Sequence, residues 1–124
     1  MRKILIVEDD LDLVETYTDL LEAKQFQVMS VLRAADAIRR ITRDKPDIII
    51  LDLNLPGDCG VVVITFVRNY PAIAKTKIIV ATGHPDIMQR AGFVSRQVDA
   101  ILTKPVSNNA LLEMIDNFLL PAAS

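Results

Sequence analysis

Five short aliphatic runs, each followed by a longer stretch of mixed polarity, constrain the fold of this chain more than any other feature. The runs cover residues 3–7, 26–32, 47–51, 77–81 and 99–103. A continuous apolar run of four to eight residues is typical of a strand that is buried on both faces. The intervening patterns predict helices over 11–24, 34–42, 61–70, 86–95 and 108–119. Strands that alternate with helices predict a parallel sheet covered on both faces.

Five strand–helix units favour one particular winding of that sheet. We expect a flavodoxin-like (βα)5 fold, an α/β three-layer sandwich with strand order 2-1-3-4-5. The chain of 124 residues fits one domain with its own core. We assign residues 1–120 to that domain and read 121–124, "PAAS", as a tail or the start of a linker.

Charge and composition exclude several classes of protein. The net charge is −2, which argues against direct contact with nucleic acid by this domain. One cysteine excludes an internal disulfide framework and fits a reducing compartment. No apolar stretch approaches the roughly 18 residues that a membrane span needs. The expectation is a cytoplasmic domain without a membrane contact.

Carboxylates follow two of the predicted strands at the point where each strand ends. Glu8 and Asp9 come directly after Val7, and Asp52 comes directly after Leu51. In this winding the first and third strands are neighbours, and their carboxyl ends flank the crevice where ligands bind. Like charges held close together are costly unless a cation offsets them. Carboxylate and carbonyl oxygens suit a hard ion, so the sequence predicts a Mg²⁺ site here.

Two further polar groups come at the ends of the fourth and fifth strands. Thr82 directly follows the run 77–81, and Lys104 directly follows the run 99–103. A hydroxyl and an ammonium beside a carboxylate and a metal are typical of a phosphoryl site, with Asp52 as the nucleophile. Taken alone, each of these residues is an ordinary strand-end or surface group, and only their combination points to chemistry.

The same residues carry a resemblance to a known family. "ILIVEDD", "LDLNLPG", "VATG" and "LTKP" stand in this order, with 30 residues from Asp52 to Thr82 and 52 from Asp52 to Lys104. In motif and spacing the chain resembles the receiver domain of two-component response regulators, over nearly its whole length. The resemblance implies a domain that is phosphorylated on an aspartate in the presence of Mg²⁺.

The resemblance assigns a role to each residue around the acids. Asp52 matches the phosphoacceptor. Glu8 and Asp9 match the acidic pair, with Asp9 as a direct metal ligand and Glu8 acting through water. Asn54 matches the position whose backbone carbonyl ligates the metal.

The likeness also assigns the groups that respond to phosphorylation. Thr82 matches the hydroxyl that shifts toward the phosphoryl group, and Lys104 matches the family's lysine. The peptide before Pro105 is expected to be cis by the same likeness. Ile101 stands where the family usually has an aromatic switch residue, and Cys59 stands where an Asp-Gly pair is common, which removes a cap from the third helix.

Partners follow from the same resemblance. A histidine kinase or a histidine phosphotransfer protein would donate the phosphoryl group. The face built from 86–95, 99–103 and 108–119 would carry the signal to an output domain or effector protein, and a homodimer would use the same face. Catalysis by the domain itself would be limited to self-phosphorylation and slow self-dephosphorylation, so the chain is not expected to be an enzyme in the metabolic sense.

Two alternatives stay open at this point. A Mg²⁺-dependent phosphatase of the haloacid-dehalogenase kind also uses an aspartate nucleophile, but its general acid lies two residues later, where this chain has Asn54. A receiver-like interaction module that is never phosphorylated would keep the fold alone. The departure at Ile101 makes the second alternative worth testing.

Overall fold

A twisted parallel sheet forms the centre of the computed structural model, which describes residues 2–55, 58–86, 92 and 96–119. The five strands lie in the order β2-β1-β3-β6-β7, and every neighbouring pair is parallel. Their bounds are β1 Lys3–Val7, β2 Gln27–Val31, β3 Ile48–Leu51, β6 Lys77–Thr82 and β7 Ala100–Thr103. In chain order these are the first to fifth strands of the sheet, so the predicted order 2-1-3-4-5 is confirmed.

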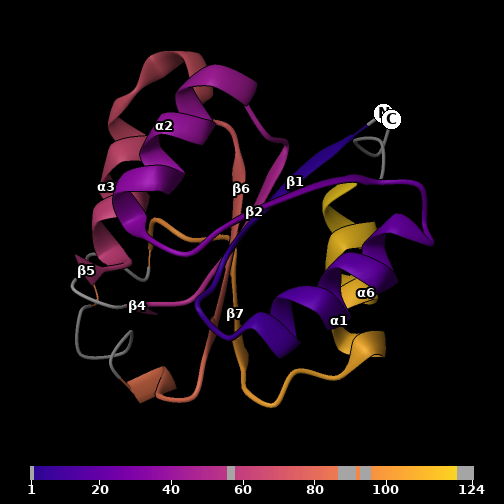
Figure 1. Ribbon diagram of the computed structural model, residues 1–124. Helices are drawn as coiled ribbons and strands as arrows, with labels where there is room; N and C mark the ends of the chain where they lie inside the picture. Colours follow the sequence, from indigo (N-terminus) through magenta and orange to yellow (C-terminus); the bar gives the residue numbers. More distant parts are fainter. Residues whose placement is uncertain (1, 56–57, 87–91, 93–95, 120–124) are drawn as a thin grey trace.

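Helices cover both faces of this sheet, as Figure 1 shows. One face carries α1 (Leu11–Glu22) and α6 (Asn108–Leu119), and the other carries α2 (Ala34–Asp44) and α3 (Val61–Asn69). Most of the predicted helix over 86–95 and the predicted tail 121–124 lie outside the described residues. Within the described part of the chain, no helix is long and apolar enough to cross a membrane.

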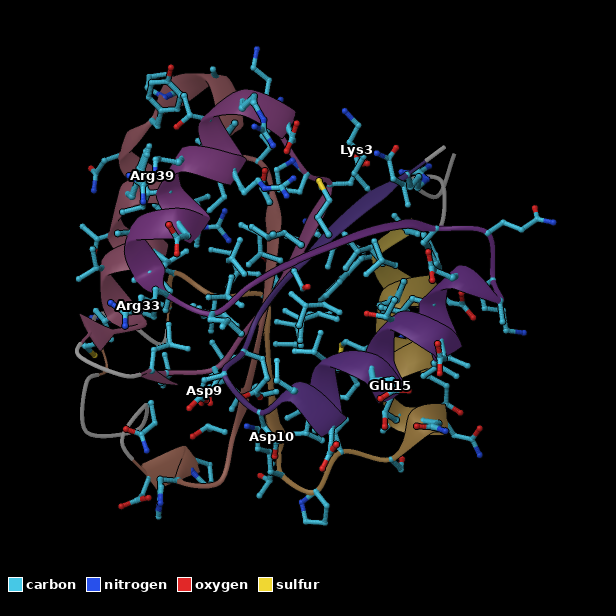
Figure 2. All side chains as sticks on the ribbon, in the orientation of Figure 1. Lys3, Asp9, Asp10, Glu15, Arg33 and Arg39 are labelled. Carbon is cyan, nitrogen blue, oxygen red and sulfur yellow. The ribbon has the colours of Figure 1, made fainter. Side chains whose placement is uncertain are left out.

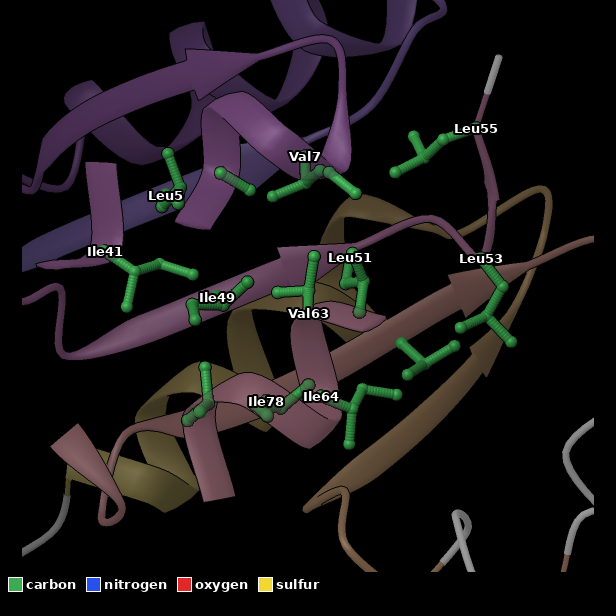
Figure 3. Close-up of a cluster of buried hydrophobic side chains, with 14 of the residues drawn as sticks. Leu5, Val7, Ile41, Ile49, Leu51, Leu53, Leu55, Val63, Ile64 and Ile78 are labelled. Carbon is green, nitrogen blue, oxygen red and sulfur yellow. The ribbon is translucent and has the colours of Figure 1, made fainter. Parts of the chain in front are cut away.

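Two hydrophobic clusters hold the layers together. Between the sheet and the α2–α3 layer lie residues such as Leu5, Ile49 and Val63, drawn in Figure 3. Between the sheet and the α1–α6 layer lie residues such as Ile6 and Ile50. Because side chains alternate between the two faces of a strand, each central strand contributes to both clusters. This double burial explains the unbroken aliphatic runs, since every residue of Ile48–Leu51 is buried.

The segment after β3 contains a small hairpin that the sequence patterns do not indicate. Two short antiparallel strands, β4 (Asn54–Leu55) and β5 (Asp58–Cys59), pair there. The buried side chain of Leu55 joins the cluster under α2 and α3, and this burial holds β4 against the domain. Three further residues, Pro71–Ile73, form the 3-10 turn η1 directly after α3. Both features are shorter than the windows in which a sequence pattern shows periodicity.

Helix ends follow the local chemistry of the chain. The carboxylate of Asp10 accepts hydrogen bonds from the backbone N–H groups of Asp12 and Leu13, at 3.0 and 3.3 Å, and so caps α1. The Ser107 hydroxyl accepts from the Ala110 N–H and caps α6 in the same way. Helix α3 begins after Gly60 with no side-chain cap, as the cysteine in place of an Asp-Gly pair predicts.

Arg68 ties together the loops that precede β6 and β7. Its guanidinium donates to the carbonyl oxygens of Gln97 (2.7 Å), Ala74 (2.9 Å) and Thr76 (2.7 Å). It also pairs with Asp99 at 2.8 Å, and the Arg68 side chain is only 20% exposed. One side chain therefore satisfies acceptors from the turn before β6 and from the approach to β7.

Arg68→Ala is expected to lower the free energy of unfolding by about 3 kcal/mol, because several half-buried acceptors lose their donor at once. Urea unfolding followed by circular dichroism measures this loss. The matched control is Arg39→Ala, whose 2.6 Å pair with Asp36 is exposed, with Arg39 76% accessible. That change is expected to cost less than about 1 kcal/mol. Equal losses in the two variants would contradict the structural role of Arg68.

Candidate functional site

The carboxyl ends of β1 and β3 place two carboxylates side by side. In the parallel register Val7 lies opposite Leu51, so the next residues, Glu8 and Asp52, leave the sheet together. The backbone N–H of Asp52 donates to the Val7 carbonyl oxygen at 2.9 Å, which extends the ladder by one step. Figure 2 shows Asp9 where β1 meets α1, at the opposite end of the sheet from Lys3. Both acids therefore lie at the edge of the sheet where the crevice is predicted.

Three carboxylates gather in that crevice. Oxygen atoms of Glu8, Asp9 and Asp52 lie within 4.8 Å of one another. Glu8 is 2% exposed and Asp52 is 7% exposed, whereas Asp9 faces solvent. Two largely buried acids and one exposed acid form a set of hard oxygen donors that is open on one side. This donor set fits a divalent cation such as Mg²⁺, which prefers one or two carboxylates together with water.

Lys104 reaches the same cluster from the far end of the chain. Its ammonium donates to Glu8 Oε1 at 2.6 Å and to Asp52 Oδ2 at 3.3 Å. The lysine backbone is fixed by a hydrogen bond from its N–H to the Thr82 carbonyl oxygen, at 2.8 Å. The following peptide to Pro105 is cis, as the resemblance predicts. The fold thus brings residues that are 96 positions apart into one ion pair.

These contacts shift two pKa values within the cluster. Burial raises the pKa of the Glu8 carboxyl, although the hydrogen bond from Lys104 works in the opposite direction. Burial alone would lower the pKa of Lys104, but the hydrogen bond and charge of Glu8 outweigh it, so the pKa is raised. The lysine is therefore held as an ammonium beside the acids.

The remaining oxygens of the buried acids have partners of their own. Glu8 Oε2 accepts from the backbone N–H groups of Asp9 (3.1 Å) and Asp10 (3.2 Å). Asp52 Oδ1 accepts from the Asn54 N–H at 3.0 Å, which orients the carboxylate at the start of β4. Both oxygens of Glu8 are thus engaged within the protein, one by backbone and one by Lys104.

Thr82 and Ile101 lie beside the cluster without joining it. Thr82 is 2% exposed at the end of β6, and its hydroxyl oxygen accepts from the His84 N–H at 3.0 Å. Among the described residues, the Thr82 hydroxyl makes no hydrogen bond with the carboxylate of Asp52 or with the ammonium of Lys104. Ile101 lies on the edge strand β7 opposite Val80 and is 37% exposed. The structure therefore brings Glu8, Asp9, Asp52 and Lys104 together and leaves Thr82 one strand away.

Gly60 is a site residue that the sequence alone did not identify. A Cβ atom added there would lie 2.6 Å from the Asp52 carbonyl oxygen and 2.9 Å from Leu53 Cα. The Gly60 N–H also donates to the Leu53 carbonyl oxygen at 2.9 Å. The start of α3 thus packs directly on the backbone that carries Asp52. The sequence pattern does not reveal this role of Gly60, because the close approach is a property of the fold.

A surface hollow lies away from the acids, beside β2 and α2. It has a volume of about 560 Å³ and includes four arginines in its lining, Arg33, Arg39, Arg40 and Arg43. Arg39 pairs with Asp36, and the carboxylate of Asp44 pairs with both Arg40 and Arg43. The basic face of α2 is therefore partly balanced by its own acids, and Figure 2 shows Arg33 and Arg39 apart from Asp9.

Comparison with known proteins agrees with this geometry. Residues 4–116 match the family model of the response regulator receiver domain. The chain is 32% identical over 118 residues to the transcriptional regulatory protein GltR of Pseudomonas aeruginosa, covering 95% of this chain and 49% of that protein. It is 31% identical to the phosphate regulon regulatory protein PhoB of Rhizobium meliloti, covering 94% of this chain and 52% of that protein. The chain thus spans about half the length of these relatives.

Solved structures show the same fold. A CheY-like response regulator receiver domain from Methylobacillus flagellatus superimposes with a TM-score of 0.84 and 26% identity, over 95% of this chain and 98% of that one. The response regulator TrrA of Thermotoga maritima, solved with Mg²⁺ and BeF, gives a TM-score of 0.84 at 24% identity, over 96% of this chain and all of that one. With motifs, strand order and family match in agreement, the chain belongs to the receiver domains of two-component response regulators.

Proposed function

We propose that Asp52 is the phosphoacceptor of this receiver domain and that Lys104, Glu8 and Asp9 serve the transfer. The observation that carries the proposal is the contact of the Lys104 ammonium with both Asp52 and Glu8, beside a three-carboxylate cluster. Receiver domains accept a phosphoryl group from histidine kinases and regulate output domains. The arrangement in this chain supports the same role.

The transfer is a displacement at phosphorus. An oxygen of the Asp52 carboxylate attacks, a P–O bond forms, and the P–N bond of the partner's phosphohistidine breaks. The electron pair of that bond returns to nitrogen, and a neutral imidazole leaves because the second ring nitrogen carries a proton. Lys104 pairs with an oxygen of the transferred group, because its ammonium already lies 3.3 Å from Asp52 Oδ2. The Asn54 N–H holds the other carboxylate oxygen and so orients the nucleophile.

Receiver domains bind Mg²⁺ at an acidic pocket, and the donor set here fits that ion. Asp9 and Asp52 would ligate it directly, Glu8 would act through water, and the backbone carbonyl of Asn54 would complete the protein ligands. Bound there, the ion would offset charge on the phosphoryl oxygens. The TrrA structure with Mg²⁺ and BeF supports this assignment by fold.

The response to phosphorylation would pass through Thr82 and the edge of the sheet. Its hydroxyl now bonds to the His84 N–H and would turn toward the phosphoryl group. Ile101 is aliphatic, so β7 would respond without the aromatic rotamer change that the family usually has at this position. The face of β7 and α6, with the segment 86–95 between β6 and β7, would contact an output domain or effector protein and could serve a homodimer.

The phosphodonor, the bounds of the domain and its own catalytic activity follow from the same assignment. A histidine kinase or histidine phosphotransfer protein would supply the phosphoryl group, and residues 1–120 would form the receiver. Receiver domains are signalling domains, and this one would catalyse only its own phosphorylation and slow dephosphorylation. The family match disfavours the haloacid-dehalogenase-like phosphatase. An unphosphorylated interaction module stays as the alternative that the test must exclude.

Intact-mass measurement after incubation with acetyl phosphate tests the proposal. The protein with Mg²⁺ is expected to gain the mass of one phosphoryl group, and EDTA is expected to prevent the gain because the acids then repel the incoming anion. No gain from protein that is folded and binds Mg²⁺ would overturn the proposal in favour of the interaction module.

Asp9→Asn is expected to weaken Mg²⁺ binding by about tenfold or more, because the exposed carboxylate is the ligand best placed to recruit the ion. Isothermal titration calorimetry measures the affinity, and the rise in melting temperature with Mg²⁺ gives a second readout. Asp19→Asn, an equal charge change on the exposed face of α1, serves as the control. Equal affinities in the two variants would remove Asp9 from the metal site.

A further inference from the structure

Tyr17 is a buried polar residue that the proposed mechanism does not use. Its side chain is 3% exposed, and its hydroxyl is a fully buried atom with no hydrogen-bond partner in the described part of the chain. A buried hydroxyl without a partner costs about 1–3 kcal/mol. Such unsatisfied groups are rare in folded proteins and are often found where function requires them.

Tyr17 packs against one face of the sheet, and the strands of that face end at the proposed phosphorylation site. Tyr17 lies on α1 against the side chains of one sheet face, which include Ile6 and Ile50. Since side chains of a strand alternate, the residues two positions later point to that same face. These residues are Glu8 and Asp52. On β7 the same face carries Leu102, and two positions later comes Lys104.

The electrostatics of the hydroxyl agree with this placement. Burial raises the pKa of Tyr17, and the charge of Lys104 acts on it in the opposite direction. The charges of Glu8 and Asp52 add to the rise. The hydroxyl therefore lies within electrostatic reach of the three charged groups that form the ion pair network of the site.

Lys104 can take a further partner when Glu8 serves a metal site. One Glu8 oxygen is bound by backbone N–H groups, and the other is bound by Lys104 at 2.6 Å. If Glu8 turns toward a cation or its water, the 2.6 Å bond from Lys104 to Glu8 Oε1 lengthens. The ammonium, whose side chain is 22% exposed, then keeps the longer 3.3 Å bond to Asp52 and has donor capacity for a further acceptor. Among the described residues, Tyr17 Oη is the one buried side-chain nitrogen or oxygen atom that lacks a hydrogen-bond partner.

We propose that Tyr17 is a positioning residue of the phosphorylation site, whose hydroxyl oxygen accepts a hydrogen bond from Lys104 when Glu8 turns toward a bound cation. The Tyr17 hydroxyl keeps the Lys104 ammonium beside Asp52, where the ammonium can pair with an oxygen of the phosphoryl group. This inference rests on the proposed function, because it gives Tyr17 a role only if Glu8 belongs to the metal site.

Tyrosine fluorescence tests the proposal without any phosphorylation. The chain has two tyrosines and no tryptophan, so Tyr70→Phe leaves Tyr17 as the sole emitter. Titration of that variant with Mg²⁺ is expected to change its emission with the same saturation as calorimetric binding. In Tyr17→Phe, where the exposed Tyr70 alone emits, Mg²⁺ is expected to change nothing. Constant Tyr17 emission while calorimetry records binding would overturn the proposal.

Phosphorylation kinetics supply the second readout. Tyr17→Phe removes only the hydroxyl and is expected to accept the phosphoryl group of acetyl phosphate about tenfold more slowly, the value of one hydrogen bond to a charged group. Tyr70→Phe is expected to react like the original protein. The unfolding midpoint of Tyr17→Phe is expected to be unchanged or higher, which separates positioning from folding. Wild-type kinetics in Tyr17→Phe would refute the role, whereas no Mg²⁺ binding or phosphorylation by the unaltered protein would refute the proposed function instead.

Discussion

Asp52→Asn is expected to abolish phosphoryl uptake, because an amide oxygen is far too weak a nucleophile to replace the carboxylate. The variant is expected to stay folded, since asparagine has the same shape and its oxygen can still accept from the Asn54 N–H. Intact mass after acetyl phosphate treatment measures uptake, and circular dichroism confirms the fold.

The matched control for this change is Asp19→Asn, which removes one carboxylate from the exposed face of α1. It is expected to be phosphorylated at the original rate. A phosphoryl group on folded Asp52→Asn protein would show that another residue accepts it, and would contradict the assignment of Asp52.

Gly60→Ala is expected to lower the free energy of unfolding by about 2 kcal/mol. The added methyl group would sit 2.6 Å from the Asp52 carbonyl oxygen and 2.9 Å from Leu53 Cα, and both are backbone atoms that cannot swing away. Gly60 has φ −59° and ψ −17°, which alanine adopts freely, so the loss would arise from crowding alone. Displacement of the Asp52 backbone is also expected to slow phosphoryl uptake by about tenfold to a hundredfold. Urea unfolding and phosphorylation rates measure the two effects.

Gly83→Ala provides the comparison, because a Cβ there meets no atom within 4 Å. It is expected to be neutral or to stabilise the protein by up to about 1 kcal/mol, through a less flexible unfolded chain. If Gly60→Ala were as stable as Gly83→Ala, the close packing of α3 on the nucleophile's backbone would be refuted.

Strand positions and the acidic crevice could be predicted from sequence because their causes are local. The run Ile48–Leu51 is buried on both faces, and that environment demands an unbroken aliphatic segment. The winding rule then brings the ends of β1 and β3 together, and Glu8 and Asp52 follow those ends directly. Lys104 could be added only through its spacing within a recognised motif, since a single lysine after a strand is usually an ordinary surface group.

Contacts that depend on exact packing left no pattern in the sequence. The closeness of Gly60 to Asp52 arises from the angle at which α3 begins, and the hairpin of β4 and β5 is too short to show periodicity. Tyr17 occupies a position of α1 that faces the core, where an apolar side chain would fit equally well. Only the structure shows that its hydroxyl has no hydrogen-bond partner among the described residues. The preference of Lys104 for Glu8 over Asp52, 2.6 against 3.3 Å, is likewise a result of side-chain geometry.

The choice of Glu8 as the closer partner of Lys104 has a functional consequence. A lysine held by Glu8 lies near the nucleophile without covering both of its oxygens, since Asp52 Oδ1 is bound by the Asn54 N–H. The Lys104 ammonium therefore offsets only part of the negative charge of the carboxylates before any phosphoryl group arrives. Entry of a cation would redistribute these bonds, and Tyr17 is the buried group positioned to receive the lysine.

Reductive trapping of the phosphorylated residue tests the central claim most directly. The protein is incubated with Mg²⁺ and acetyl phosphate, treated with borohydride, which converts an aspartyl phosphate to homoserine, and analysed as peptides by mass spectrometry. The account predicts homoserine at position 52 and unmodified aspartates at the neighbouring positions 9 and 10. Trapping at any other aspartate, with position 52 intact, would contradict the assignment of Asp52 as the phosphoacceptor.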